Sequence, residues 1–215
     1  MAELIVKSKP FKYMITIIDY GMGNVGSIKN MIKKIGYDAI ISSNKNDIDN
    51  ASKLILPGVG RFDTAMENLN SLDLSELLKQ KAAEDTPLLG ICLGMQLLAN
   101  KSDEGIIDGL GLIPGEVKKF NLQAPFKVPH MGWNEVNYSK ESILFKGFQQ
   151  FEEARFYFVH SYYFQCTSKE NSIGETTFSH TFTSAVQKGN IFGVQFHPEK
   201  SHIFGMELLK NFADI

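Results

Sequence analysis

The sequence predicts an α/β protein built on a mostly parallel central sheet, with helices on both faces and a small antiparallel extension. Two observations lead to this prediction. The first half of the chain alternates short apolar strands with helical patterns, and the second half carries short β-rich runs separated by turn residues. Ligands of such sheets bind at the carboxyl ends of the parallel strands, so functional residues are expected there.

Hydrophobic spacing defines the elements of the first half. The run 15–19 begins with four β-branched residues, three of them isoleucine, as expected of a buried parallel strand. Apolar residues then recur at helical spacing from Asn24 to Ile35, and Gly36 ends this helix. Pro57-Gly58 is expected to stop the third strand. Further strands are expected at 39–41, 53–56 and 87–91, and further helices at 64–69, 74–83 and from about Gly94.

After Gly109 the pattern changes to short strands with a closing helix at 206–212. The sequence has no internal repeat or long linker, so one domain is expected over residues 14–215, preceded by an N-terminal arm of residues 1–13. The strands expected in this half are 116–120, 156–164, 184–188 and 191–196.

Composition argues against several classes of protein. The 215 residues carry 22 basic and 24 acidic side chains, a net charge of −2, which argues against a strongly basic nucleic-acid binder and against attraction to a membrane surface. No run approaches the roughly 20 apolar residues of a membrane-spanning helix. With two cysteines, Cys92 and Cys166, disulfides are not expected to organise the fold, and a reducing, cytoplasmic location is expected.

A glycine-rich turn at residues 21–26 fits the pattern G-x-G-x-x-G of dinucleotide-binding turns, and it lies between a predicted strand and a predicted helix. That pattern also requires an acidic residue at the end of the second strand, where this chain has Ser42, Ser43 and Asn44. Asp47 has a suitable distance in sequence but falls in the next connection. We therefore interpret the turn as a tight strand-to-helix connection, and no cofactor is expected.

Cys92 is the strongest candidate for a catalytic residue. It ends a predicted strand just before a predicted helix, with Gly90 and Gly94 two residues to either side. This is the cysteine version of the G-x-S-x-G nucleophile elbow, whose strained turn places the sulfur at a helix N-terminus that favours the thiolate. The N–H of Leu93 is then available to an oxyanion. Cys166 has no such context and is interpreted as structural.

A thiolate nucleophile needs a base, and His197 is the best candidate. It follows the strand expected at 191–196, and Pro198 biases it toward extended backbone. Since residues two apart in an extended chain point to the same side, Glu199 can meet His197 and fix its tautomer. No histidine–cysteine spacing predicts a metal site. The remaining histidines lack a carboxylate two residues away and are interpreted as structural or solvated: His130, His160, His180 and His202.

On these residues the chain resembles the class I glutamine amidotransferases, which hydrolyse glutamine with a Cys-His-Glu triad. The resemblance implies the three-layer, flavodoxin-like fold of that family. The triad motifs mark the superfamily, whereas residues 129–134 and 157–163 are similar to the glutaminase subunits that serve histidine biosynthesis. The resemblance runs from about Met14 to the C-terminus, and it is carried by 19–24, 57–60, 90–96, 129–134, 157–163 and 195–201.

The resemblance also implies roles for individual residues. It makes Cys92 the nucleophile, His197 the acid and base, and Glu199 the group that orients His197. An oxyanion strand at Gly58, Val59 and Gly60 is implied, in which the N–H of Val59 becomes a donor after a peptide flip. Further contacts to glutamine are implied for Leu93, Gln96, Glu104, Ser161 and Tyr162, and a position facing a partner subunit for Asn24, Trp133, Asn134 and Lys200.

In the resembled subunits, ammonia passes through the core of a (β/α)8 cyclase subunit, so the resemblance implies a heterodimer whose glutaminase is latent until docked. No P-loop is present, so ATP-driven activation is not expected in this chain. His202 departs from the histidine-pathway pattern, and the residues around it are similar to paralogues that supply ammonia to bacterial surface sugars, which is a second hypothesis. A stand-alone cysteine hydrolase and a non-catalytic, flavodoxin-like binding module are competing hypotheses from different classes of protein.

Overall fold

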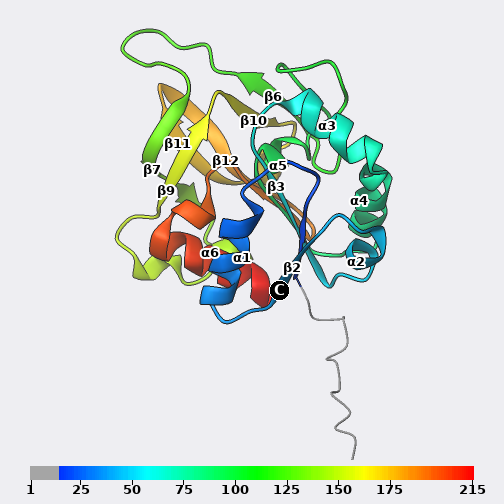
Figure 1. The fold of residues 1–215 in the computed structure, drawn as a ribbon. Coiled ribbons are helices and arrows are strands. Elements are labelled where there is room, and N and C mark those ends of the chain that lie inside the picture. The colour runs from blue at the N-terminus through cyan, green and yellow to red at the C-terminus, as the bar shows by residue number, and fades with distance from the viewer. Residues whose placement is uncertain (1–14) are drawn as a thin grey trace, which may run out of the picture.

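The computed structural model describes residues 15–215, so the predicted arm of residues 1–13 lies outside the described part of the chain. The main sheet has the strand order β2-β1-β3-β4-β13-β12-β10-β6-β5. Figure 1 labels β2, β3, β12, β10 and β6 of this sheet. The strands from β2 to β13 are parallel neighbours and confirm the predicted parallel centre. They are β2 (Ala39–Ser42), β1 (Ile15–Ile18), β3 (Lys53–Gly58), β4 (Leu88–Cys92) and β13 (Ile191–Val194).

Helices cover both faces of this parallel centre, as the sequence predicts. Alternate strand residues point into two cores: Ile55 shares one core with Ile28 and Phe212, whereas Leu54 shares the other with Leu78. The three-layer arrangement follows from this alternation. One face carries α1 (Val25–Lys34) and α6 (His202–Asp214), and the other carries α2 (Lys45–Asp49), α3 (Phe62–Ser71) and α4 (Leu74–Ala83) (Figure 1).

The antiparallel extension is broader than the sequence predicts. From β13 outward the strands are antiparallel neighbours, with β5 parallel to β6 at the edge and β11 and β8 branching from β12. Its strands are β12 (His180–Lys188), β10 (Tyr162–Cys166), β6 (Gly115–Lys119), β5 (Lys101–Ser102), β11 (Ser172–Phe178) and β8 (Asn137–Tyr138). A separate antiparallel pair joins β7 (His130–Glu135) to β9 (Arg155–His160).

The run expected as one strand at 156–164 is two strands that divide at Ser161. The first, β9, pairs with β7 in the small sheet, and the second, β10, pairs with β6 and β12 in the main sheet. Buried residues keep the same alternation through the break, from Phe156 and Phe158 to Phe164. The single-strand prediction was wrong because hydrophobic alternation shows which side faces inward, not which strand is the neighbour.

β3 runs through Pro57 to Gly58, so the prediction that Pro57 stops this strand was also wrong. Leu54 donates its N–H to Pro87 on the β4 side, and by alternation the nitrogen of Pro57 faces the β1 side. Pairing with β1 has already ended at Ile55, so the N–H that proline lacks is not required there.

Several short elements have no counterpart in the prediction: α2, β5, β7, β8 and β11. α2 begins after Asn44, whose side chain accepts the N–H of Asn46 at 2.8 Å, a capping signal in a connection that lacks an apolar pattern. Single-turn 3₁₀ helices complete the chain, at Ile143–Phe145, Phe148–Gln150, Lys169–Asn171 and Pro198–Lys200.

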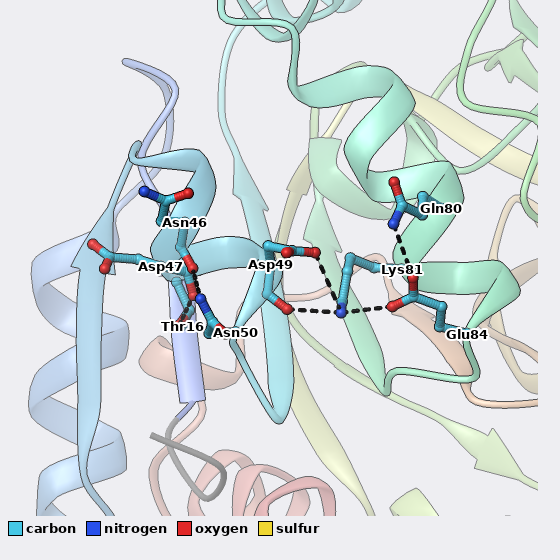
Figure 2. Close-up of polar contacts among 8 residues, drawn as sticks. All are labelled: Thr16, Asn46, Asp47, Asp49, Asn50, Gln80, Lys81 and Glu84. Atoms are coloured by element: carbon cyan, nitrogen blue, oxygen red, sulfur yellow. Dashed lines mark hydrogen bonds and ion pairs between the residues drawn. The ribbon is translucent and has the colours of Figure 1, made fainter. Parts of the chain in front are cut away.

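A buried cation joins α2 to α4. The ammonium group of Lys81 donates to the carbonyl oxygen of Asp49 at 2.7 Å and to Oε2 of Glu84 at 2.7 Å, and Oδ1 of Asp49 lies 3.7 Å away (Figure 2). The Lys81 side chain is 10% exposed. Because burying an ammonium group is costly, these acceptors are needed to keep it in place.

We expect Lys81→Met to lower the free energy of unfolding by about 1–3 kcal/mol, because it removes charge-assisted hydrogen bonds to Asp49 and Glu84. Lys79→Met is the matched control, since Lys79 pairs with Glu76 on the solvent side of the same helix. The free energy of unfolding of the Lys79→Met variant should fall by about 0.5 kcal/mol or less. Urea unfolding of both variants measures the difference, and equal losses would contradict the structural role of Lys81.

Candidate active site

The candidate active site forms where neighbouring parallel strands end. Cys92 is the last residue of β4 and lies opposite Gly58, the last residue of β3. His197 follows β13 on the other side of β4, and Tyr20 follows β1. The carboxyl-end location expected from the sequence is therefore the location of the predicted catalytic residues.

The turn at Cys92 has the geometry of a nucleophile elbow. Cys92 has φ 55° and ψ −111°, a conformation that costs energy for any residue other than glycine. A Cβ on Gly94 would lie 1.8 Å from the carbonyl oxygen of Leu56 in β3, and one on Gly90 would lie 2.6 Å from the carbonyl oxygen of Gly94. Both glycines are thus required by the close packing of α5 (Leu93–Gln96) on the sheet.

His197 and Glu199 meet as the sequence predicts. His197 is extended, with φ −102° and ψ 96°, and its Nδ1 lies 2.9 Å from Oε1 of Glu199. Both side chains are buried, at 2% and 1% exposed. Nε2 of His197, the nitrogen that is not bonded to Glu199, has no hydrogen-bond partner, and the ring lines the same cavity as Cys92. It is therefore free to exchange a proton at the sulfur.

The charge state of His197 is set by opposing effects. Burial lowers the pKa of the ring, but the nearby Cys92 sulfur and the hydrogen-bonded Glu199 carboxylate raise the pKa well above its ordinary value. The imidazolium form is therefore favoured when the sulfur is a thiolate. Cys166 lacks such partners, and burial raises the pKa of its thiol to about 11, which leaves it protonated and unreactive.

A cavity of about 340 Å³ opens above Cys92, a size suited to a small molecule. Gly58 is buried at the end of β3 beside it, and Glu199 is buried behind His197. The cavity is lined by Cys92 and His197, by Pro129, Val159 and His160, and by the residues expected to bind glutamine: Val59, Gly60, Leu93, Gln96, Glu104, Ser161 and Tyr162. The structure thus brings residues from distant parts of the chain into one cavity.

Two polar side chains in the cavity have fixed orientations. Nε2 of Gln96 donates to the carbonyl oxygen of Tyr162 at 3.0 Å and to Oε1 of Gln195 at 3.0 Å, which leaves Oε1 of Gln96 as an acceptor for a ligand. Oε2 of Glu104 accepts the N–H of Phe62 at 2.9 Å. Burial raises the pKa of the Glu104 carboxyl group, while the Phe62 bond opposes that rise.

Sequence reasoning missed Gln195 and Tyr20. Nε2 of Gln195 lies 3.8 Å from Sγ of Cys92, and the spacing of two residues from His197 could have indicated that both face one side. Tyr20 is buried and its hydroxyl donates to the carbonyl oxygen of Pro57 at 2.7 Å, next to Gly58. Burial raises the pKa of Tyr20, as does the nearby Cys92, so the hydroxyl stays a donor.

The residues expected to face a partner divide into two groups. Asn24 and Lys200 are exposed, and Lys200 lies 5.7 Å from the ring centroid of Tyr157. Trp133 is 40% exposed and its ring stacks on His202 with centroids 5.4 Å apart. Asn134 is half-buried, and its side chain donates to the carbonyl oxygen of Thr177 at 3.0 Å.

The glycine-rich turn at residues 21–26 is a tight connection, as interpreted from the sequence. Gly23 has φ +114°, and a Cβ there would lie 2.9 Å from Cβ of Pro57, so the turn packs directly on β3. Asp47, which has a suitable sequence distance for a ribose, is in α2, and its Oδ2 accepts the hydroxyl of Ser42 at 2.6 Å. This turn serves packing beside the cavity.

Within residues 15–215, no cluster of three or more histidine, cysteine or acidic side chains is placed to hold a metal ion. In the same part of the chain, no helix has the length and apolar character needed to cross a membrane. Cys92 and Cys166 are both free thiols.

Comparison with known proteins assigns the family. The sequence model described as "Glutamine amidotransferase class-I" matches residues 16–215. The imidazole glycerol phosphate synthase subunit HisH 2 of Methanococcus maripaludis is 58% identical over 200 residues, which cover 93% of this chain and 98% of the relative. Subunit HisH of Bdellovibrio bacteriovorus is 46% identical over 206 residues, which cover 94% and 100%.

Solved structures agree on the fold. A crystal structure described as a glutamine amidotransferase superposes with a TM-score of 0.71 at 16% sequence identity, covering 94% of this chain and 99% of the other. The structure of PurLQS from Thermotoga maritima also gives 0.71 at 16% identity, with 94% and 98% covered. These distant similarities confirm the flavodoxin-like, three-layer fold.

The chain therefore belongs to the class-I glutamine amidotransferases, and it is an enzyme of that family rather than a non-catalytic binding module. Within the family it groups with the HisH subunits of imidazole glycerol phosphate synthase, the name carried by relatives that match nearly its whole length.

We expect Gly94→Ala to abolish the site geometry, because the new Cβ would overlap the carbonyl oxygen of Leu56. The free energy of unfolding should fall by at least about 2 kcal/mol. Gly26→Ala is the matched control, since Gly26 is exposed in α1 and has no atom within 4 Å of the new Cβ. Its effect should stay within about 1 kcal/mol. Similar losses in the two variants, measured by urea unfolding, would contradict this packing argument.

We expect Cys92→Ala to lower the pKa of His197. The substitution removes the sulfur and its negative charge, so that burial is opposed only by Glu199. A titration of the imidazole nitrogens by NMR measures the change, and Cys166→Ala provides the control. A pKa of His197 that is the same in the Cys92→Ala variant and in the unsubstituted protein would show that the sulfur and the ring do not interact.

Proposed function

We propose that the chain is the glutaminase subunit of an imidazole glycerol phosphate synthase, in which Cys92, His197 and Glu199 hydrolyse glutamine to glutamate and ammonia. The observation that carries the proposal is the buried His197–Glu199 pair beside Cys92 at the base of a cavity. The names of the relatives support the same reaction class.

In the proposed reaction, the thiolate of Cys92 attacks the side-chain amide carbon of glutamine. The C–N bond then breaks as protonated His197 gives its proton to the nitrogen, which leaves as ammonia. A γ-glutamyl thioester remains on Cys92. Water attacks this thioester while His197 accepts a proton, the C–S bond breaks, and glutamate leaves with the thiolate restored. Glu199 keeps Nδ1 of His197 protonated throughout.

The oxyanion that forms during both steps needs backbone donors. Leu93 is the first residue of α5, so its N–H has no acceptor within the helix and can face the oxyanion. We propose Val59 as the second donor, after the Gly58–Val59 peptide turns toward the cavity. Val59 is 44% exposed at the cavity rim, and its neighbour Gly60 has φ +106°, a conformation that permits such a turn.

Substrate glutamine would be held by the polar groups of the cavity wall. Oε1 of Gln96 is free to accept from the α-ammonium group, and the carboxylate of Glu104 faces the same cavity. Ser161 lies between β9 and β10, Tyr162 is the first residue of β10, and both offer backbone groups to the α-carboxylate. These groups discriminate glutamine from simpler amides.

We propose a (β/α)8 cyclase subunit as the partner in a heterodimer that uses the released ammonia in histidine biosynthesis. The exposed residues Asn24, Met131, Trp133 and Lys200 form the surface proposed to meet it, with Asn134 on the same strand as Trp133. Residues 14–215 form the amidotransferase domain in this proposal, and the free thiols Cys92 and Cys166 suit a reducing cytoplasm.

A second candidate is a paralogous subunit that supplies ammonia for amination of a bacterial surface sugar. The observation that favours it is the stack of His202 on Trp133, with ring planes 4° apart, because this stack occupies the surface proposed to meet the partner. The reaction at Cys92 would be the same, and the partner and the acceptor of ammonia would differ.

Glutamate release from glutamine tests the proposal directly. We expect turnover that appears or rises strongly when the cyclase subunit and its acceptor nucleotide are added, and a loss of at least about 1,000-fold in Cys92→Ser. Cys166→Ser is the matched control and should keep full activity, because Cys166 lies on β10 away from the cavity lining.

The outcomes separate the candidates. Turnover that is absent with this cyclase would remove the histidine-pathway assignment in favour of the surface-sugar candidate. Equal turnover with and without a partner would favour a stand-alone cysteine hydrolase. Full activity of Cys92→Ser would overturn the nucleophile itself.

A further inference from the structure

A pair of buried histidines takes no part in the proposed chemistry, although one of them, His160, lines the cavity and the other, His130, lies behind it. His130 on β7 and His160 on β9 are 4% and 6% exposed, and they are direct partners in the register of the small sheet. Nδ1 of His130 lies 2.9 Å from Nε2 of His160. One of these nitrogens must donate and the other must accept, so the two rings depend on one another for their tautomers.

A backbone carbonyl group determines which of the two histidines donates the hydrogen bond between them. Nδ1 of His160 lies 2.8 Å from the carbonyl oxygen of Tyr162, which can only accept, so Nδ1 of His160 carries the proton. In a neutral ring Nε2 is then an acceptor. Nδ1 of His130 must therefore be the donor to it, which leaves Nε2 of His130 as an acceptor.

Asn134 supplies the matching donor at the far end. Its Nδ2 lies 3.2 Å from Nε2 of His130 and donates to Thr177 at 3.0 Å, while its Oδ1 accepts the N–H of Glu135 at 2.8 Å. The amide orientation is thus fixed from both sides. All donors in the chain of hydrogen bonds consequently point from Asn134 through His130 and His160 to Tyr162.

The chain of hydrogen bonds requires both rings to be neutral. A second proton on either ring would place two N–H donors opposite one another with no acceptor between them. The aromatic and buried surroundings of the two rings favour their neutral forms. The ring of His130 lies between those of Phe158 and Phe178, at 4.9 and 4.2 Å between centroids. Burial lowers the pKa of His130 to about 4 and that of His160 to about 3.

The carbonyl group of Tyr162 connects this chain of hydrogen bonds to the candidate active site. It accepts from His160 on one side and from Nε2 of Gln96 on the other. Gln96 also donates to Gln195, whose Nε2 lies 3.8 Å from Sγ of Cys92. A shift of the carbonyl would therefore change the orientation of the Gln96 amide and of the group next to the sulfur.

Asn134, at the other end of the chain of hydrogen bonds, lies on β7, and the second face of this strand is exposed to solvent. Along β7, buried His130 and half-buried Asn134 alternate with Met131 and Trp133, which are 62% and 40% exposed. A partner protein that packs against Met131 and Trp133 therefore contacts β7, the strand that also carries His130 and Asn134.

We propose that His160 is a positioning residue that sets the Tyr162 carbonyl for glutamine binding, and that His130 transmits to it the docking of a partner on the outer face of β7. The inference rests on the proposed function, since it needs glutamine in the cavity and a partner subunit on that face. Neither histidine touches the reacting atoms.

Three variants separate the two roles in the complex with the cyclase subunit. His160→Phe removes both hydrogen bonds of His160, whereas His160→Asn keeps a donor in the place of Nδ1 and loses only the link to His130. His130→Phe keeps the stacking between Phe158 and Phe178 and loses the same link from the other side. His180→Phe is the matched control, since His180 packs on Phe120 as His160 does and its Nε2 has no hydrogen-bond partner.

We expect His160→Phe to raise the KM for glutamine by about tenfold, and His160→Asn to restore it to within about twofold. His130→Phe should leave the KM near that of the unsubstituted protein but reduce the stimulation of kcat by the partner at least about fivefold. His180→Phe should change neither quantity. A purely structural role would instead lower thermal stability without this division between KM and stimulation, and that result would overturn the proposal.

An NMR measurement on the unsubstituted chain tests the hydrogen-bond direction without any assay of activity. Nitrogen shifts should show Nδ1–H and unprotonated Nε2 in both His130 and His160 at neutral pH. An Nε2–H tautomer in either ring would overturn the proposal even if the enzyme is a glutaminase. An unsubstituted complex that does not hydrolyse glutamine would instead overturn the proposed function, and this inference with it.

Discussion

The close contact between α5 and β3 is the constraint on which the candidate active site depends. The backbone of Gly94 approaches the Leu56 carbonyl so closely that no side chain fits between them, and this proximity forces the strained turn at Cys92. The strain is offset by burial of the surrounding apolar strands, since β4 is buried along its whole length. A looser contact would let Cys92 relax into an ordinary strand end, and the sulfur would no longer face the cavity at the start of a helix.

Burial lowers the pKa of each buried histidine in this region, and the neighbouring groups decide whether the ring is charged. For His197, burial favours the neutral ring, and the interactions with Cys92 and Glu199 outweigh it. For His130 and His160 nothing outweighs burial, so both rings stay neutral and can form a directed chain of hydrogen bonds. Histidines of similar burial therefore differ in charge because only one of them has anionic neighbours.

The predictable parts of the fold and site are those encoded locally. The parallel strands follow from apolar runs, and Cys92, His197 and Glu199 follow from glycine spacing and from extended backbone before Pro198. The hydroxyl of Tyr20 meets Pro57, 37 residues away, and His130 meets His160, 30 residues away, so neither contact has a local signal. The division of 156–164 into β9 and β10 was missed for the same reason, because the choice of a neighbouring strand is a long-range property.

Covalent catalysis by the residue at this turn is the central claim, and intact-protein mass spectrometry of the complex during turnover tests it most directly. A reaction quenched rapidly in acid during steady-state turnover should show a fraction of the chain heavier by one γ-glutamyl group. Peptide mapping should place that group on Cys92, and the species should be absent from Cys92→Ser. Steady glutamate production with no acylated chain at any time, or a γ-glutamyl group on Cys166, would contradict the account.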